Sequence, residues 1–240
     1  MPDPWRPGPG GGRDMSGGRS TGDGLPRVPS VLAVCAHPDD ESFGLGAALS
    51  SWAAAGTHVS VLCFTHGEAS SLGTASGDLH RVRQAELASA AGELGVGSVA
   101  LLGYPDGSLG DEPIEELSAE LRRAVEREAP NLLLVFDEGG ITGHGDHVRA
   151  TEVAVAVGGE LGVPVLAWAV PEAVAARLNA ELGTSFAGRP RHQIDLVVDV
   201  DRERQLRAIR CHASQAGENP VLWRRLELQR GEEAFRWLAR

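Results

Sequence analysis

The sequence predicts an α/β fold, with a Rossmann-like, mostly parallel sheet, helices on both faces, and a smaller C-terminal β/α extension. Three observations predict it. Short apolar runs rich in β-branched residues recur along the chain, helical stretches separate them, and their spacing suits right-handed βαβ units. The length of 240 residues, without an internal repeat, is enough for one domain with a sizeable core.

The apolar runs are typical of strands buried on both faces. Five strands are predicted over residues 31–36, 58–64, 98–103, 131–136 and 163–170. The helices between them are predicted over 42–55, 78–94, 113–128 and 146–157. The extension comprises a strand over 193–200, a helix over 201–213 and a helix near the C-terminus. Residues 171–191 form either a substrate-facing insertion or a connecting helix and loop.

The N-terminal segment has a different composition from the rest. Residues 1–30 contain 8 glycines and 6 prolines and hardly any apolar residues, so they bury too little surface to offset their ordering entropy. We therefore expect residues 1–29 to be disordered and residues 30–240 to form a single domain. Met15 is an alternative start to Met1.

The charged residues exclude several classes of function. All 22 basic residues are arginine, which removes the P-loop lysine, Schiff-base enzymes and Ser–Lys nucleophile pairs. The net charge of −11 disfavours phosphate backbones and anionic lipid heads, so we expect neither nucleic acid nor a membrane as partner. Gly44-Leu45-Gly46 lacks the third glycine of a dinucleotide fingerprint.

The remaining composition indicates a cytoplasmic protein. Three scattered cysteines do not make a disulfide framework, and no apolar run reaches the roughly 18 residues of a membrane span. The first residues do not read as a secretion signal. A homo-oligomer stays open.

Two His/Asp clusters follow the first and fourth predicted strands. His37-Pro38-Asp39-Asp40-Glu41 comes directly after the first, and Gly143-His144-Gly145-Asp146-His147 follows the fourth after a glycine-rich turn. These two strands flank the point where strand order reverses in the common arrangement, and ligands bind there at the carboxyl ends of strands. The clusters therefore meet in one crevice, although each acidic residue alone would also serve as a helix cap.

The clusters have the composition of a catalytic zinc site. Such a site takes three His or carboxylate ligands and leaves a fourth position for water. One His and one Asp of the first cluster with one His of the second satisfy it, and a spare carboxylate and imidazole remain as base and acid. The chemistry leaves open which of Asp39 and Asp40, and which of His144 and His147, binds metal.

The motifs resemble those of a known family. AHPDDESFGLGAAL and GHGDH are similar to the first and second motifs of the LmbE-like, or PIG-L, family of zinc-dependent N-acetylglucosaminyl deacetylases. Weaker similarities follow in the family's order over residues 65–68, 83–86, 104–107 and 212–215, so the resemblance covers roughly residues 30 to 215.

The resemblance implies roles for six residues. It makes His37, Asp40 and His147 the ligands of Zn²⁺, with Fe²⁺ able to occupy such a site as well. Asp39 would be the general base toward metal-activated water, and His144 the acid that protonates the departing amine. Asp146 would hold the His144 ring in the right tautomer. The implied reaction removes acetyl from the nitrogen of a small N-acetylated sugar or sugar conjugate.

Four further residues are expected to bind substrate. The resemblance places Arg83 near substrate hydroxyls, with a surface salt bridge to Glu86 as the alternative. Asp106 would contact a sugar hydroxyl or form a turn. His66 would line the rim of the site or be solvated, and His212 would bind substrate or cap a helix.

One position departs from the mycothiol-pathway branch of the family, where a tyrosine helps to stabilise the oxyanion. Thr142 stands there, two residues before His144, and its side chain is much shorter. Alternatives to a sugar deacetylase are an amidohydrolase acting on a secondary metabolite or thiol conjugate, and a low-activity metal-binding accessory protein.

Overall fold

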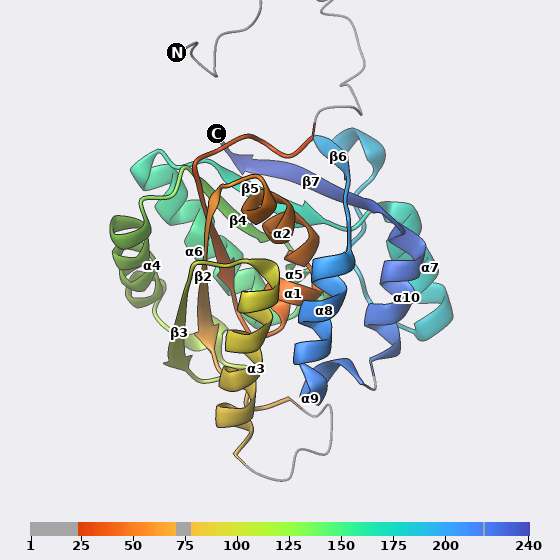
Figure 1. Cartoon of the computed structure of the whole chain (residues 1–240), viewed down its shortest axis with the longest axis horizontal. Helices are drawn as coiled ribbons and strands as arrows, with labels where there is room; N and C mark the ends of the chain where they lie inside the picture. The colour runs from red at the N-terminus through yellow and green to blue at the C-terminus, as the bar shows by residue number, and fades with distance from the viewer. Residues whose placement is uncertain (1–23, 71–77, 218) are drawn as a thin grey trace, which may run out of the picture.

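The computed structural model describes residues 24–70, 78–217 and 219–240, which form one layered α/β unit around a single sheet (Figure 1). The seven strands of this sheet have the order β3-β2-β1-β4-β5-β7-β6. Their bounds are β1 Ser30–Cys35, β2 His58–Thr65, β3 Ser98–Tyr104, β4 Leu132–Phe136, β5 Val165–Ala169, β6 Leu196–Asp199 and β7 Glu232–Ala239. The first five are parallel, and β7 pairs antiparallel with both β5 and β6. The strand order reverses between β1 and β4, as the sequence predicts.

Helices cover both faces of the sheet. The longer ones are α2 Gly46–Ala54, α3 Leu79–Leu94, α4 Ile114–Glu128, α6 Gly145–Leu161, α7 Glu172–Leu182, α8 Glu203–Cys211 and α10 Pro220–Gln229. Short turns of helix complete the chain: α1 Asp40–Phe43, α5 Gly140–Gly143, α9 Ala213–Ala216, and the 3-10 turns over Leu109–Asp111 and Arg191–Gln193. None of the helices in the described ranges is long and apolar enough to cross a membrane.

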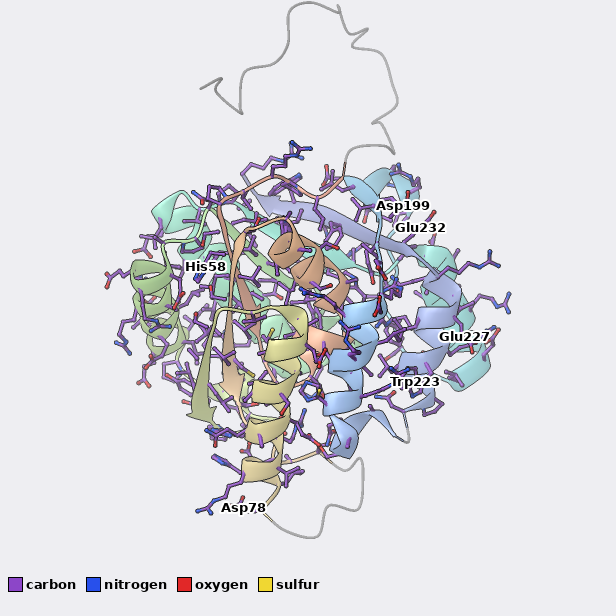
Figure 2. The ribbon with its side chains drawn as sticks, viewed as in Figure 1. His58, Asp78, Asp199, Trp223, Glu227 and Glu232 are labelled. Carbon is purple, nitrogen blue, oxygen red and sulfur yellow. The ribbon has the colours of Figure 1, made fainter. Side chains whose placement is uncertain are left out.

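The period of two along each strand divides the core between the two faces. Val31, Ala33 and Cys35 of β1 belong to the cluster that packs under α2, α3, α7 and α8. Leu32 and Val34 belong to the cluster under α4 and α6. Three acidic side chains, Asp78, Asp199 and Glu227, lie on the surface (Figure 2).

The structure corrects the single helix predicted over 42–55. The chain forms α1 and then starts α2 at Gly46, because the backbone at Gly44 lies against the ring of Phe136. A Cβ at Gly44 would stand 2.3 Å from Phe136 Cε1, so this residue type is required for the close approach. The predicted helix over 201–213 likewise ends earlier, at Cys211.

The sequence did not predict the last strand, β7. Its sequence EEAFRWLA places charged residues among apolar ones, which hides the strand pattern. Glu233 is nevertheless buried, because it pairs with Arg202 and accepts a hydrogen bond from Trp168 Nε1 at 2.6 Å. Partners from distant segments thus allow a carboxylate inside the sheet.

The packed chain begins before the predicted domain boundary at residue 30. Leu25 and Val28 pack against the core, and the carbonyl of Pro26 accepts a 2.8 Å hydrogen bond from Trp52 Nε1. Of the segment expected to be disordered, residues 1–23 lie outside the described residues.

Candidate functional site

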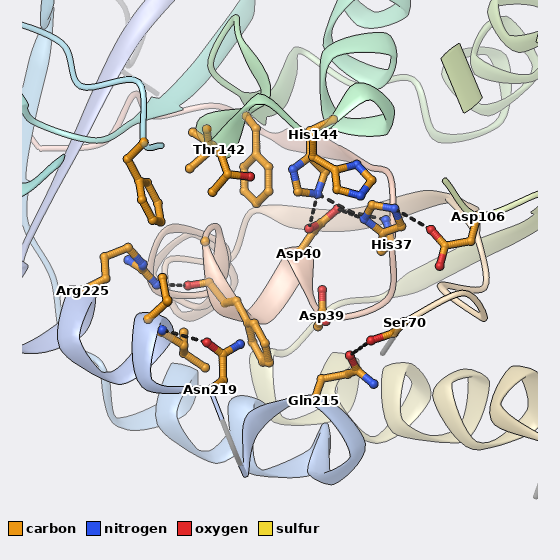
Figure 3. A pocket seen from close by; sticks show the side chains of 18 of the residues that line it. His37, Asp39, Asp40, Ser70, Asp106, Thr142, His144, Gln215, Asn219 and Arg225 are labelled. Atoms are coloured by element: carbon orange, nitrogen blue, oxygen red, sulfur yellow. Dashed lines mark hydrogen bonds and ion pairs between the residues drawn. The ribbon is translucent and has the colours of Figure 1, made fainter. Parts of the chain in front are cut away.

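The two His/Asp clusters meet at the carboxyl edge of β1 and β4, where a pocket of ≈ 580 Å³ opens (Figure 3). Residues from both clusters line it, together with side chains from the β2–α3, β3–α4 and C-terminal segments. These lining residues include His37, Asp39, Asp40, Arg83, Asp106, Thr142, His144 and His147. The predicted convergence of the clusters is therefore confirmed.

The first loop presents two adjacent carboxylates in different directions. Asp39 has φ 114°, a left-handed backbone conformation that is costly for a residue with a side chain. Asp40 Oδ2 turns back and accepts hydrogen bonds of 2.9 Å from the amides of Ala36 and His37. This leaves Asp39 facing the pocket and Asp40 fixed against the end of β1.

Three ligand atoms converge on one point in the pocket. His147 Nε2 lies 3.0 Å from Asp40 Oδ1 and 3.1 Å from His37 Nδ1. His37 Nδ1 lies 3.9 Å from Asp40 Oδ2. Two imidazole nitrogens and a carboxylate oxygen at such separations match the ligand set of a catalytic zinc site.

In His37 and His147, the ring nitrogen that points away from the site has hydrogen-bond acceptors beside it. These acceptors determine which nitrogen of each ring carries the proton. His37 Nε2 lies 3.1 Å from Asp146 Oδ2 and 3.0 Å from Asp106 Oδ1, so it bears the proton. His147 Nδ1 donates to the carbonyl of Gly140 at 3.2 Å. The nitrogens left facing each other at 3.1 Å therefore both present lone pairs, which a cation between them would satisfy. The residues present fit a divalent metal.

The carboxylates around the three ligand atoms concentrate negative charge that attracts a cation, either a proton on the imidazoles or a metal ion that displaces it. Burial opposes a charge on Asp40, but His147 and His37 outweigh it and hold the pKa of the carboxyl far below its usual range. Burial also disfavours charged His37, yet Asp106 and Asp146 raise its pKa to about 10. Asp106 and Asp146 thus concentrate negative charge behind this ligand.

Asp39 is held by a buried arginine. Arg83 Nη2 donates to Asp39 Oδ2 at 2.8 Å, and the guanidinium also binds the carbonyls of Pro38 and Gly67. Burial raises the pKa of Asp39 to about 6, although Arg83 acts in the opposite direction. A carboxylate with this pKa, beside the three converging ligand atoms, suits proton transfer near neutral pH.

Arg83 does not form the surface salt bridge with Glu86 that was the alternative expectation. The guanidinium is buried against Asp39, and Glu86 instead accepts hydrogen bonds from the amide and hydroxyl of Ser214. Arg83 does line the pocket, so a contact with substrate hydroxyls stays a prediction.

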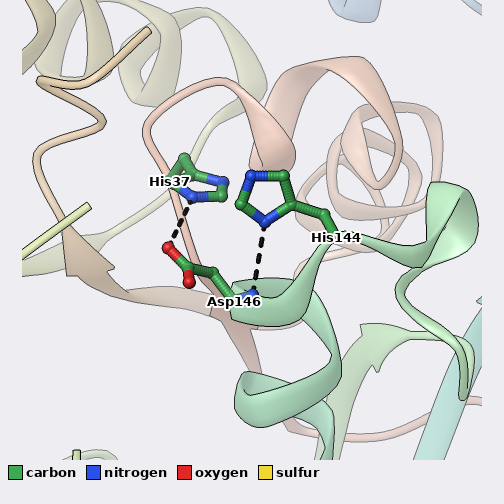
Figure 4. A group of neighbouring side chains, drawn as sticks. All are labelled: His37, His144 and Asp146. Carbon is green, nitrogen blue, oxygen red and sulfur yellow. Dashed lines mark hydrogen bonds and ion pairs between the residues drawn. The ribbon is translucent and has the colours of Figure 1, made fainter. Parts of the chain in front are cut away.

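His144 begins helix α6 and faces the pocket. Its Nδ1 accepts a 3.2 Å hydrogen bond from the amide of Asp146, so the neutral ring bears its proton on Nε2 (Figure 4). Burial, His37 and His147 together lower the pKa of His144. The side chain is thus a hydrogen-bond donor toward the pocket.

Asp146 contacts His144 as expected, but through its backbone amide, and its carboxylate has other partners. Its oxygens accept from the amides of Gly107 at 2.8 Å and Leu109 at 3.0 Å, and from His37. The carboxylate therefore positions a metal ligand and ties the β3–α4 loop to the site, while the Asp146 backbone fixes the His144 tautomer.

Two of the expected substrate-binding residues are not among the pocket-lining residues in the described part of the chain. His66 stacks on His80 with ring centroids 3.3 Å apart. His212 is fully buried, and its Nε2 lies 2.7 Å from Glu41 Oε1. Asp106 does line the pocket, but one of its oxygens is held by His37 and the other by the amide of Ala69.

Sequence reasoning missed the residue that supports the first loop. Glu41 is fully buried and accepts hydrogen bonds from the amide of Asp39, the hydroxyl of Ser42 and His212. Its position in the first motif could have indicated a role for Glu41. Nothing in the sequence indicated that its partner would be His212, 171 residues away. The apolar residues Trp168 and Phe186 in the pocket wall had no distinguishing signal in the sequence.

The fold and the site together define an α/β protein with a His/Asp/His group that could hold a metal ion at the switch point of a parallel sheet. The family model described as PIG-L, GlcNAc-PI de-N-acetylase, matches residues 32–157. The chain belongs to this family.

Among curated relatives, a 1D-myo-inositol 2-acetamido-2-deoxy-alpha-D-glucopyranoside deacetylase of Thermobispora bispora is 33% identical over 52% of this chain and 49% of its own length. The enzyme of that name from Acidothermus cellulolyticus is 30% identical over 78% of this chain and 80% of its own. The match therefore spans about half the length of the first relative and four-fifths of the second.

A solved structure supports the same fold. The zinc-inhibited form of teicoplanin deacetylase Orf2 superimposes with a TM-score of 0.67 at 21% identity, over 87% of this chain and 97% of that one.

Proposed function

We propose that this protein is a metal-dependent hydrolase that removes the acetyl group from the nitrogen of an N-acetylglucosamine-type sugar or sugar conjugate. The observation that supports it is the placement of Asp39 and His144 beside three converging ligand atoms at the floor of one pocket. Membership of the PIG-L family and the curated relatives, which are named as deacetylases of a 2-acetamido sugar, agree with this reaction.

His37, Asp40 and His147 would hold the metal ion, for which we propose Zn²⁺, with Fe²⁺ as the other cation that suits this donor set. When bound there, such an ion supplies positive charge that polarises the amide carbonyl and acidifies water. Asp106 and Asp146 hold His37 in the tautomer that this requires.

The chain's own groups then move the protons. Asp39 accepts a proton at its carboxylate from the attacking water, and Arg83 keeps that carboxylate aimed into the pocket. His144 donates a hydrogen bond from Nε2 to the developing negative charge and keeps that proton, and Asp39 passes the proton that it accepted from water to the departing amine nitrogen. The C–N bond breaks, and acetate and a free amine leave.

Measurements of metal content and turnover on three forms of the protein test the proposal. Wild type is expected to hold about one divalent ion per chain, Asp39→Ala to keep it, and His147→Ala to lose it. Amine release from N-acetylglucosamine derivatives should fall by a factor on the order of 10² to 10⁴ in Asp39→Ala. Full activity in Asp39→Ala, or wild type that binds no metal on reconstitution, would refute it.

A further inference from the structure

The pocket has two chemically different sides, and strand order separates them. The metal-binding residues and Asp39 follow β1 and β4 at the centre of the sheet. Lining residues on one side follow β2 and β3, and those on the other side follow β4 and β5 or belong to α10. Figure 3 shows Asp106, Ser70 and Gln215 on one side of Asp40 and Arg225 and Asn219 on the other.

The side next to β2 and β3 is polar. Arg83, Ser70, Asp106 and Gln215 line it, and Ser70 donates to Gln215 Oε1 at 2.6 Å. Hydroxyl groups of a sugar need such partners, because a buried hydroxyl without a hydrogen bond costs free energy. The amine half of the substrate, with its hydroxyls, therefore belongs on this side.

The side next to β4, β5 and α10 is apolar. Most of its lining side chains are apolar, namely Phe43, Phe136, Ile141, Trp168, Phe186, Val221 and Leu222, and the polar ones are Thr142, Asn219 and Arg225. Trp168 and Phe186 are almost fully buried, yet both still border the cavity. An acetyl group has a single methyl and would leave most of this apolar surface in contact with water.

The arginine on the apolar side serves as part of the wall. The Arg225 guanidinium lies over the Trp168 ring, with Cζ 4.9 Å from the ring centroid. Its two terminal nitrogens donate to Gln229 Oε1 and to the carbonyl of Phe43. These hydrogen bonds hold the guanidinium against the wall, but both acceptors are neutral, so its positive charge stays available to a carboxylate at the end of an acyl chain.

We propose that this apolar side is an acyl subsite, so that the enzyme hydrolyses N-acyl groups longer than acetyl in preference to acetyl. This inference rests on the proposed function of the same site. The reaction balances as amide hydrolysis: water adds to the acyl carbon, the C–N bond breaks, the amine takes a proton, and an alkyl carboxylate is released. The alkyl chain lies against Trp168 and Phe186 while the scissile carbonyl faces the metal ligands.

A series of N-acylglucosamines tests it, with released amine measured for acetyl, butyryl and succinyl compounds. Each buried methylene is worth about a factor of four, so butyryl should exceed acetyl in kcat/KM by up to about 15-fold. Succinyl has the chain length of butyryl and ends in a carboxylate that the charge of Arg225 attracts, so it should also exceed acetyl. Turnover of the acetyl compound that equals or exceeds turnover of the butyryl compound overturns the proposal.

A filling variant tests the location. Val221→Trp narrows the apolar side, and the butyryl-to-acetyl ratio should fall to near one. Val82→Trp adds the same side chain on exposed helix α3, outside the pocket, and should keep the wild-type ratio. A wild-type ratio in Val221→Trp would place the acyl chain elsewhere.

Binding separates failure of this inference from failure of the proposed function. Calorimetry on Asp39→Asn, which cannot turn substrate over, should show tighter binding of the butyryl than of the acetyl compound. If wild type releases no amine from any substrate, the proposed function fails, and this binding ratio still decides the acyl subsite.

Discussion

Replacing Arg83 with methionine removes the charge that holds Asp39 while keeping an unbranched apolar side chain. Arg83 is 3% exposed and bonds Asp39 Oδ2 at 2.8 Å, the carbonyl of Gly67 at 2.6 Å and the carbonyl of Pro38. Loss of one partner of a buried ion pair costs about 3–5 kcal/mol, because the other charge stays buried without compensation. We expect Arg83→Met to lose a free energy of unfolding of this size.

Urea unfolding followed by circular dichroism measures the loss. Arg122→Met is the matched control, since Arg122 pairs with Glu160 at 2.7 Å on the surface, where removal should leave the urea midpoint unchanged. The metal content of Arg83→Met should stay at the wild-type level, because neither Arg83 nor Asp39 is a ligand. Amine release by Arg83→Met should nevertheless fall. The pKa of Asp39 rises once the charge of Arg83 is gone, and a protonated Asp39 cannot accept a proton from water.

The result that would refute this reasoning is an Arg83→Met protein with the same urea midpoint as Arg122→Met. The ion pair would then contribute no net stability, and Arg83 would act on substrate alone, as the resemblance suggested. Loss of metal from Arg83→Met would equally contradict the assignment of Asp39 as a base outside the ligand set.

Two further predictions concern helix packing and the metal. A Cβ at Gly158 would stand 2.5 Å from Val165 Cγ2 and 2.8 Å from the carbonyl of Val163, so Gly158→Ala should destabilise by about 1–3 kcal/mol. A Cβ at Gly159 on the same helix would meet nothing within 4 Å, so Gly159→Ala should stabilise the protein by about 0.5–1 kcal/mol in the same urea titration. A Gly158→Ala protein more stable than Gly159→Ala would contradict the packing of α6 against β5. Chelation should lower the thermal midpoint of wild type, because the bound metal ion stabilises the folded state. Its removal should cost about 2.7 kcal/mol of stability where the free metal concentration had been 100 times Kd. The thermal midpoint of His147→Ala should not change. A chelator-sensitive His147→Ala protein would place the metal elsewhere.

The sequence determined the parallel part of the sheet and the position of the site. Strands β1 and β4 are almost continuous apolar runs, and such runs identify strands buried on both faces without reference to the rest of the chain. The order rule for open α/β sheets then placed the two His/Asp clusters together, because each follows a strand that borders the switch point.

The tertiary structure alone decided the partners of buried polar groups. Glu41 and His212 are 171 residues apart, and Arg83 and Asp39 are 44 apart; no local pattern states that these pairs meet. Strand β7 stayed hidden for the same reason, since Glu233 is stable inside the sheet only through Arg202 and Trp168.

The division of the pocket was also a tertiary outcome. Trp168 reads in the sequence as an ordinary residue of a buried strand, and Phe186 as part of an irregular segment. They border the pocket because β5 lies next to β4 in the sheet and Arg225 of α10 lies over the Trp168 ring. Periodicity reports which side chains are buried, whereas the three-dimensional packing determines which buried side chains border an open cavity.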